Sequence, residues 1–121
     1  MFRIKLLWVG KTKETFLQEG ILHYQKKLRS YLRLNCEEVH SSPHKKGGRN
    51  DSLREETQKI LQRVDSAEQT IFLDEQGKGL SSKEFAAFLE QQMNSGISSM
   101  TFVIGGAYGF QQDLIPDSSK K

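Results

Sequence analysis

The chain has little of what would mark a membrane protein or a disulfide-bonded secreted protein. Only 36% of its 121 residues are hydrophobic, and no apolar stretch approaches the roughly 20 residues that cross a bilayer. Charges interrupt the apolar run at 2–9, which predicts a strand rather than a signal peptide. The single Cys36 can form neither an internal disulfide nor a Cys-based metal site. We therefore predict a cytosolic protein with one domain, residues 1–121, around a single core.

Recognisable catalytic spacings are also lacking, because no Ser-His-Asp or Cys-His pairing can be read from the chain. His40 and His44 lie near Lys45, Lys46 and Arg49, and two histidines in such a basic stretch make a poor metal site, so we predict none. The loop expected at 41–50 is rich in Lys, Arg, Ser and Gly and is better suited to RNA phosphates. His23 is expected on the surface. No catalytic residue is assigned from the sequence.

The positive charge is concentrated in the first half of the chain. Residues 1–50 hold eleven Lys or Arg and four Asp or Glu, a balance of +7, whereas residues 51–121 have a balance of −4. Clustered positive charge suits a polyanionic partner such as RNA. A solvated helix face explains the same charge equally well.

The apolar residues alternate between the period of a strand and the period of a helix. Strands are expected at 2–9, 34–40, 69–73 and 100–104. Helices are expected at 17–31, 53–64 and 81–93. The third helix opens on a capping box, Ser81 to Glu84, and is expected to stop at Gly96. Strands separated by such helices predict right-handed βαβ crossovers and an α/β fold, a parallel sheet with both faces covered.

The segment Val9-Gly-Lys-Thr12 resembles the end of a phosphate-binding loop. That loop also needs a glycine five residues before Gly10, where this chain has Lys5. We therefore interpret Gly10 as a strand terminator, with Lys11 and Lys13 on the surface.

Two strands run into glycine-containing turns. The strand at 100–104 is followed by Gly105-Gly-Ala-Tyr-Gly109, where a backbone without side chains can approach a ligand. Leu73-Asp-Glu-Gln-Gly-Lys78 ends another strand in a similar way. Carboxyl ends of parallel strands share one edge, so the turns could form two walls of one pocket. A tight strand-to-helix turn at Gly105, and a solvated loop at Asp74 and Lys78, remain the alternatives.

Five elements occur in an order and at spacings typical of one known family. They are Val9-Gly-Lys, the basic loop, Phe72-Leu-Asp-Glu-Gln-Gly-Lys78, Leu80-Ser-Ser82 and Phe102-Val-Ile-Gly-Gly-Ala-Tyr-Gly109. Together they resemble the ribosomal RNA large-subunit methyltransferase H family, of the trefoil-knotted SPOUT class. The elements LD-x-x-GK and VIGG-x-x-G are individually modest and jointly specific.

The resemblance implies an S-adenosyl-L-methionine-dependent enzyme. Its implied reaction is methylation of N3 of a pseudouridine in 23S ribosomal RNA, with the large ribosomal subunit as partner and a homodimer as the assembly. The implied cofactor-binding residues are Leu73, Gly105 and Gly106. From the residues alone, a non-catalytic RNA-binding α/β fragment is the alternative.

The resemblance weakens after about residue 112. Family members continue with a strand, a Ser-rich loop and a long helix that complete the knot and the third wall of the cofactor site. Residues 113–121 contain no apolar strand, and Pro116 stops a helix from continuing. We therefore expect a SPOUT-type α/β/α sandwich without the knot segment, and with apolar surface exposed.

Overall fold

The computed structural model describes residues 2–10, 14–39, 48–64, 69–74, 77, 79–105, 110 and 114, with side chains from 53 onward in the second helix. The strands are β1 (Arg3–Val9), β2 (Arg33–Val39), β3 (Gln69–Leu73) and β4 (Ser99–Ile104). The helices are α1 (Thr15–Leu28), α2 (Gly48–Arg63) and α3 (Ser82–Asn94). None of these helices is both long and apolar enough to serve as a membrane span.

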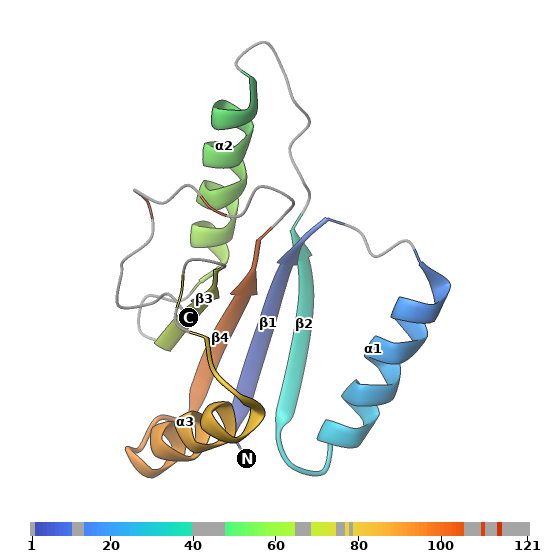
Figure 1. Ribbon diagram of the computed structural model, residues 1–121, viewed down its shortest axis with the longest axis vertical. Helices are drawn as coiled ribbons and strands as arrows, with labels where there is room; N and C mark the ends of the chain where they lie inside the picture. The colour runs from blue at the N-terminus through green and yellow to red at the C-terminus, as the bar shows by residue number, and fades with distance from the viewer. Residues whose placement is uncertain are drawn as a thin grey trace.

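The four strands form one parallel sheet in the order β2-β1-β4-β3 (Figure 1). Strands and helices alternate along the chain, and the two central strands are the first and the last in sequence. The predicted α/β fold with a parallel sheet is confirmed. Each neighbouring pair starts and ends almost together, so the sheet has a distinct amino end and a distinct carboxyl end.

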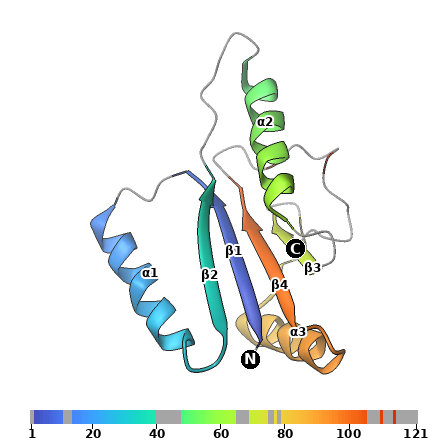
Figure 2. The ribbon, with the colours of Figure 1, turned by 180° about the vertical axis from the view of Figure 1, so that it is seen from behind.

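A hydrophobic core lies on each face of the sheet, because successive residues of a strand point to opposite faces. The core on the α2 face consists of Leu7, Val39, Ile60, Phe72, Val103 and Phe110. The core on the α3 face consists of Ile71, Met100 and Phe102, with Phe85, Phe88 and Leu89 of α3 packed against them. Figure 2 shows the same sheet from behind.

Helix α1 lies beside β2, on the same face as α3 (Figure 1). Gln25 Nε2 of α1 donates a hydrogen bond of 3.0 Å to Cys36 Sγ, and Cys36 is the register partner of Leu6 in the α3-face core. The predicted helix is confirmed, but no residue of α1 is buried. Its exposed apolar residues are Phe16, Leu17, Leu22, Tyr24 and Leu28.

Helix α3 has both of the boundaries that its sequence predicts. Glu84 N donates to Ser81 Oγ at 3.1 Å, and Ser81 N donates to Glu84 Oε1 at 3.0 Å, which completes the capping box. At the other end Gly96 has φ of 89°. Gly96 N donates to Met93 O, and Ile97 N donates to Gln92 O. This pair of bonds is the Schellman motif, whose left-handed residue is usually glycine.

Helix α2 begins at Gly48, inside the stretch that we expected to be a loop, so the prediction of a loop over the whole of 41–50 was wrong. Glycine is a poor residue inside a helix, but the first turn tolerates it because its N–H groups have no partners within the helix. Residues 41–47 lie outside the described part of the chain.

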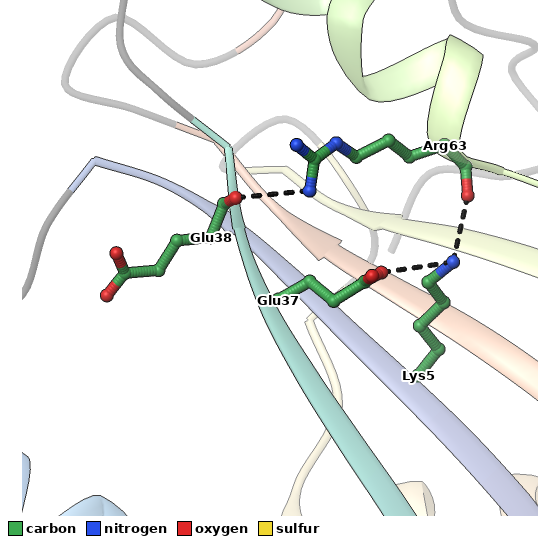
Figure 3. Close-up of polar contacts among 4 residues, drawn as sticks. All are labelled: Lys5, Glu37, Glu38 and Arg63. Carbon is green, nitrogen blue, oxygen red and sulfur yellow. Dashed lines mark hydrogen bonds and ion pairs between the residues drawn. The ribbon is translucent and has the colours of Figure 1, made fainter.

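The last residue of α2 is tied to the two strands beneath it (Figure 3). Lys5 Nζ donates to Arg63 O at 3.0 Å and lies 3.0 Å from Glu37 Oε2, while an Arg63 guanidinium nitrogen donates to Glu38 O at 3.2 Å. A cation at the carboxyl end of a helix is favourable for two reasons. It donates hydrogen bonds to the last carbonyl groups, and it is attracted to the negative end of the helix dipole. These contacts fix the end of α2, from which the chain returns toward β3.

Candidate functional site

Strands β3 and β4 end side by side at the carboxyl end of the sheet. Leu73 and Ile104, the last residues of the two strands, are register partners. Asp74 and Gly105 follow them directly. The sequence placed the two glycine-containing turns at one edge, and the structure brings their first residues together as expected.

An apolar row runs across the sheet at this edge. Trp8 of β1 is the register partner of Ile104, and Ile104 is the partner of Leu73, so the three side chains share one face. Leu73 is 37% exposed and Ile104 is 41% exposed, although both end strands that are otherwise largely buried. Covering such side chains is favourable by about 25 cal/mol for each Å² removed from water. We call these three residues the carboxyl-edge row.

Trp8 also carries a buried donor. Its Nε1 is shielded from solvent and has no hydrogen-bond partner among the described residues. An unpaired buried N–H is uncommon in folded proteins, because it carries a desolvation cost of about 1–3 kcal/mol. This donor belongs to the row that flanks the two turns.

Two carboxylates accompany the row. Glu38 is the register partner of Trp8, and Figure 3 shows its carboxylate pointing away from Lys5 and Glu37. Asp74 follows Leu73 and its carbonyl accepts a hydrogen bond of 2.9 Å from Gly77 N, which closes the turn. Glu38 therefore adds negative charge to the face of the row, and Asp74 adds a carboxylate in the residue that directly follows Leu73, which favours a cationic ligand at this edge.

Gly10 ends β1 at the same edge. Its φ is 91°, a left-handed conformation that favours glycine, and its N–H donates to Val39 O at 2.8 Å. The interpretation of Gly10 as a strand terminator is confirmed. Lys11 and Lys13 lie outside the described residues.

The other candidates have different outcomes. Gly106 and Lys78 lie outside the described residues, as do His40 and His44. His23 is exposed on α1, as expected, with its ring 5.4 Å from that of Tyr24. Among the residues that the structure describes, no three His, Cys, Asp or Glu side chains gather as metal ligands would.

The sequence did not identify Trp8 or Ile104 as site residues. Their apolar character was visible, but their alignment with Leu73 depends on the strand order β2-β1-β4-β3. The periodicity of one strand does not reveal its neighbours in the sheet. A tryptophan immediately before a strand-terminating Val-Gly pair was the available signal.

A cleft of about 820 Å³ lies at the opposite, amino end of the sheet. Its lining comes from the beginnings of β1, β2 and β4 and from the last turns of α1. It is not the edge at which parallel α/β sheets bind ligands, which lies beyond the carboxyl ends of the strands. The cleft is therefore treated separately from the carboxyl-edge row.

Comparison with known proteins defines the class. The sequence profile described as "Predicted SPOUT methyltransferase" matches residues 2–121. The chain therefore belongs to the SPOUT methyltransferase family, and its parallel sheet flanked by helices is consistent with that fold.

Individual relatives narrow the class further. The chain is 38% identical to "Ribosomal RNA large subunit methyltransferase H" of Citrifermentans bemidjiense, over 89% of this chain and 69% of the relative. It is 37% identical to the protein of the same name from Streptococcus mutans, over 93% of this chain and 73% of the relative. It is also 37% identical to the protein of that name from Flavobacterium johnsoniae, over 98% of this chain and 76% of the relative.

Proposed function

We propose that the chain binds S-adenosyl-L-methionine at the carboxyl end of the sheet and serves methyl transfer to ribosomal RNA. The observation that carries this proposal is the exposed, in-register pair Leu73 and Ile104 beside Gly105, in a member of the SPOUT family. Gly106 is included in the proposed site from the family resemblance.

The residues present suit this cofactor in three respects. The carboxyl-edge row offers apolar surface to an adenine ring and a methionine stem. The backbone after Ile104 is a glycine, so a ligand can approach its polar groups closely. Glu38 and Asp74 place carboxylates beside a ligand that is a sulfonium cation.

When bound, the cofactor supplies an electrophilic methyl group on sulfur. The role proposed for this chain is to hold the acceptor nitrogen in line with that methyl group. Correct orientation of the reacting groups can supply a large part of the lowering of the activation barrier. Methyl transfer from such a cofactor would form a nitrogen–carbon bond, break a sulfur–carbon bond and release the N3 proton of the acceptor to solvent. The carboxyl-edge row would exclude water from one side of the bound cofactor. No described side chain is assigned as a base.

The proposed acceptor is N3 of a pseudouridine in 23S ribosomal RNA. This substrate rests on the resemblance and on the name of the relatives, which describes them as acting on large-subunit ribosomal RNA. A protein with that substrate would work in the cytoplasm, on or near the large ribosomal subunit.

The proposed assembly is a homodimer. Helix α1 supports it, because its exposed Phe16 and Leu22 form apolar surface that a second copy could cover. Sedimentation velocity of the chain, with Leu22→Lys as the variant, tests the assembly. We expect a dimer that Leu22→Lys shifts toward monomer, whereas a wild-type monomer at all concentrations would contradict it.

Calorimetric titration with S-adenosylmethionine tests the cofactor site. We expect saturable binding that Leu73→Lys weakens at least tenfold, because the new cation repels the sulfonium and removes apolar contact. Met93→Lys is the matched control, since Met93 is 40% exposed on α3 and lies outside the proposed site. No binding at millimolar cofactor, or equal losses in the two variants, would refute the proposal.

A non-catalytic RNA-binding fragment is the second candidate, favoured by the basic first half of the chain. It predicts that RNA binds with affinity that falls steeply with salt and that S-adenosylmethionine has no effect. RNA binding together with cofactor binding would favour the methyltransferase.

A further inference from the structure

The amino end of the sheet carries a second surface with a different chemistry. The cleft of about 820 Å³ lies there, between the end of α1 and the first residues of the strands. Arg3, Arg29 and Arg33 line it, together with the polar side chains of Gln25 and Asn35. All three arginines are exposed.

Every charged residue in the described segments that build this end is a cation. The segments are 2–7, 25–36 and 95–102, and none of them contains an Asp or Glu. Their cations are Arg3, Lys5, Lys26, Lys27, Arg29 and Arg33. Lys5 is paired with Glu37 of β2. The three guanidinium groups that line the cleft have no hydrogen bond or ion pair with another described residue.

Two of these arginines are placed against each other by the sheet. Arg3 and Arg33 are register partners at the start of β1 and β2. Like charges directly opposite each other on neighbouring strands are destabilising. A polyanion that bridges the two guanidinium groups would turn this repulsion into a favourable contact.

An exposed aromatic residue, Tyr31, is the sequence neighbour of a residue that lines the cleft, Leu32. Tyr31 lies in the turn from α1 to β2, between Arg29 and Arg33, and its side chain is 76% exposed. The backbone of the turn is held, because Tyr31 N and Leu32 N both donate to Leu28 O, at 2.9 and 3.0 Å. The turn thus presents a large aromatic ring to solvent from an ordered backbone.

We propose that this surface, named here the amino-end surface, binds a single-stranded segment of RNA. Arg3, Arg29 and Arg33 contact phosphates, and Tyr31 stacks on an unpaired base. Basic side chains combined with exposed aromatic rings are the usual means of holding single strands. The choice of RNA rests on the proposed function, but the surface itself does not depend on cofactor binding.

The geometry separates this surface from the reacting base. β1 runs from Arg3 to Val9, seven residues at about 3.3 Å each, so roughly 20 Å separate the two ends of the sheet. The amino-end surface therefore holds RNA away from the methylated nucleotide. An A-form duplex would contact the arginines but could not offer a base face to Tyr31, because its bases are stacked.

Fluorescence anisotropy with fluorescein-labelled oligouridylate and the full chain tests the role of Tyr31. We expect Tyr31→Ser to weaken binding at least fivefold and Tyr31→Phe to retain it, since stacking needs the ring and not the hydroxyl. Tyr24→Ser is the matched control, because Tyr24 is also a largely exposed tyrosine but lies within α1 rather than in the turn between Arg29 and Arg33. Equal affinities for wild type and Tyr31→Ser would overturn the stacking role.

A salt series tests the arginines. Each lost contact to a phosphate of a single strand reduces the slope of log affinity against log salt by about 0.7, so Arg29→Gln with Arg33→Gln should reduce it by about 1.4. Arg54→Gln with Lys59→Gln on α2 makes the same change in net charge and should leave the slope unaltered. Equal changes in both double variants would show that only net charge matters and would overturn the proposal.

Titration with S-adenosylmethionine keeps this proposal distinct from the proposed function. Arg29→Gln with Arg33→Gln should leave cofactor affinity within twofold of wild type. If RNA binding depends on these residues while the cofactor does not bind, the amino-end surface stands and the methyltransferase proposal fails. If the cofactor binds and RNA affinity is unchanged by the substitutions at Arg29, Tyr31 and Arg33, the amino-end surface fails alone. A duplex bound as tightly as the single strand would also overturn it.

Discussion

The two ends of the sheet are built from the same strands and differ in chemistry. The carboxyl end presents the apolar row of Trp8, Leu73 and Ile104 with carboxylates nearby. The amino end presents arginines and an exposed tyrosine, with no acidic residue in its described segments. One end is suited to a small cationic ligand with an apolar body, and the other to a polyanion.

The contrast shows how one parallel sheet can keep two ligand chemistries apart. Both cores lie between the two ends, so the strands act as a rigid spacer. Charge at one end is about 20 Å from the other, beyond the Debye length of about 8 Å at physiological salt. Substitutions at one end should therefore leave binding at the other nearly unchanged.

The largest loss of stability is expected for a substitution in the core between the two ends of the sheet. Phe72 is 2% exposed and its ring stacks edge-on against Phe110, with centroids 5.3 Å apart. Phe72→Ala should lower the free energy of unfolding by about 3–5 kcal/mol, because it removes a buried ring and leaves a cavity. Urea denaturation measures this loss. Tyr24→Ala, at a side chain that is 64% exposed on α1, should change stability by less than about 0.5 kcal/mol, and a loss as large as that of Phe72→Ala would contradict the assignment of the core.

A smaller loss of stability is expected when the amino-terminal cap of α3 is removed, at the point where the chain leaves the carboxyl end of the sheet. Ser81→Ala removes the capping box of α3 and should cost about 1 kcal/mol of stability, measured by thermal or urea denaturation. Ser82→Ala, one residue later inside the helix, is the control and should have little effect. Equal losses would show that the two capping hydrogen bonds do not determine where α3 begins.

The smallest effect is the response of cofactor binding to salt. S-adenosylmethionine releases no condensed counterions, so its affinity should change by less than about twofold over a salt range in which RNA affinity falls steeply. Calorimetry and anisotropy on one protein preparation compare the two. If the affinities for both ligands fell equally with salt, both ligands would bind the same charged surface, and the two ends of the sheet would not differ in the ligand they bind.

The sequence predicted the elements better than their arrangement. The four strands, the three helices and both boundaries of α3 follow from periodicity and capping chemistry, which are local properties. Gly48 as the first residue of α2 was missed, because glycine pairs usually indicate loops. Periodicity predicted α1 as a helix, but it does not reveal how the helix packs, and the structure leaves most of its apolar side chains exposed.

The site was predictable only where it follows a single strand. Leu73 and Gly105 could be named because each ends or follows a strand at a glycine-containing turn. Trp8 and Ile104 could not, because their place in the row depends on which strands are neighbours. Arg3 and Arg33 share this limit, since they are 30 positions apart in the chain and meet only through the pairing of β1 and β2.

The carboxyl end of the sheet is the proposed binding site of the methyl donor. Ultraviolet crosslinking of radiolabelled S-adenosylmethionine to the chain, followed by tryptic mapping, tests it most directly. We expect label in the peptide of residues 64–78, which contains Leu73, or in that of 84–120, which contains Ile104 and Gly105. Label confined to peptides within residues 28–45, which include Arg29, Tyr31 and Arg33, would contradict it.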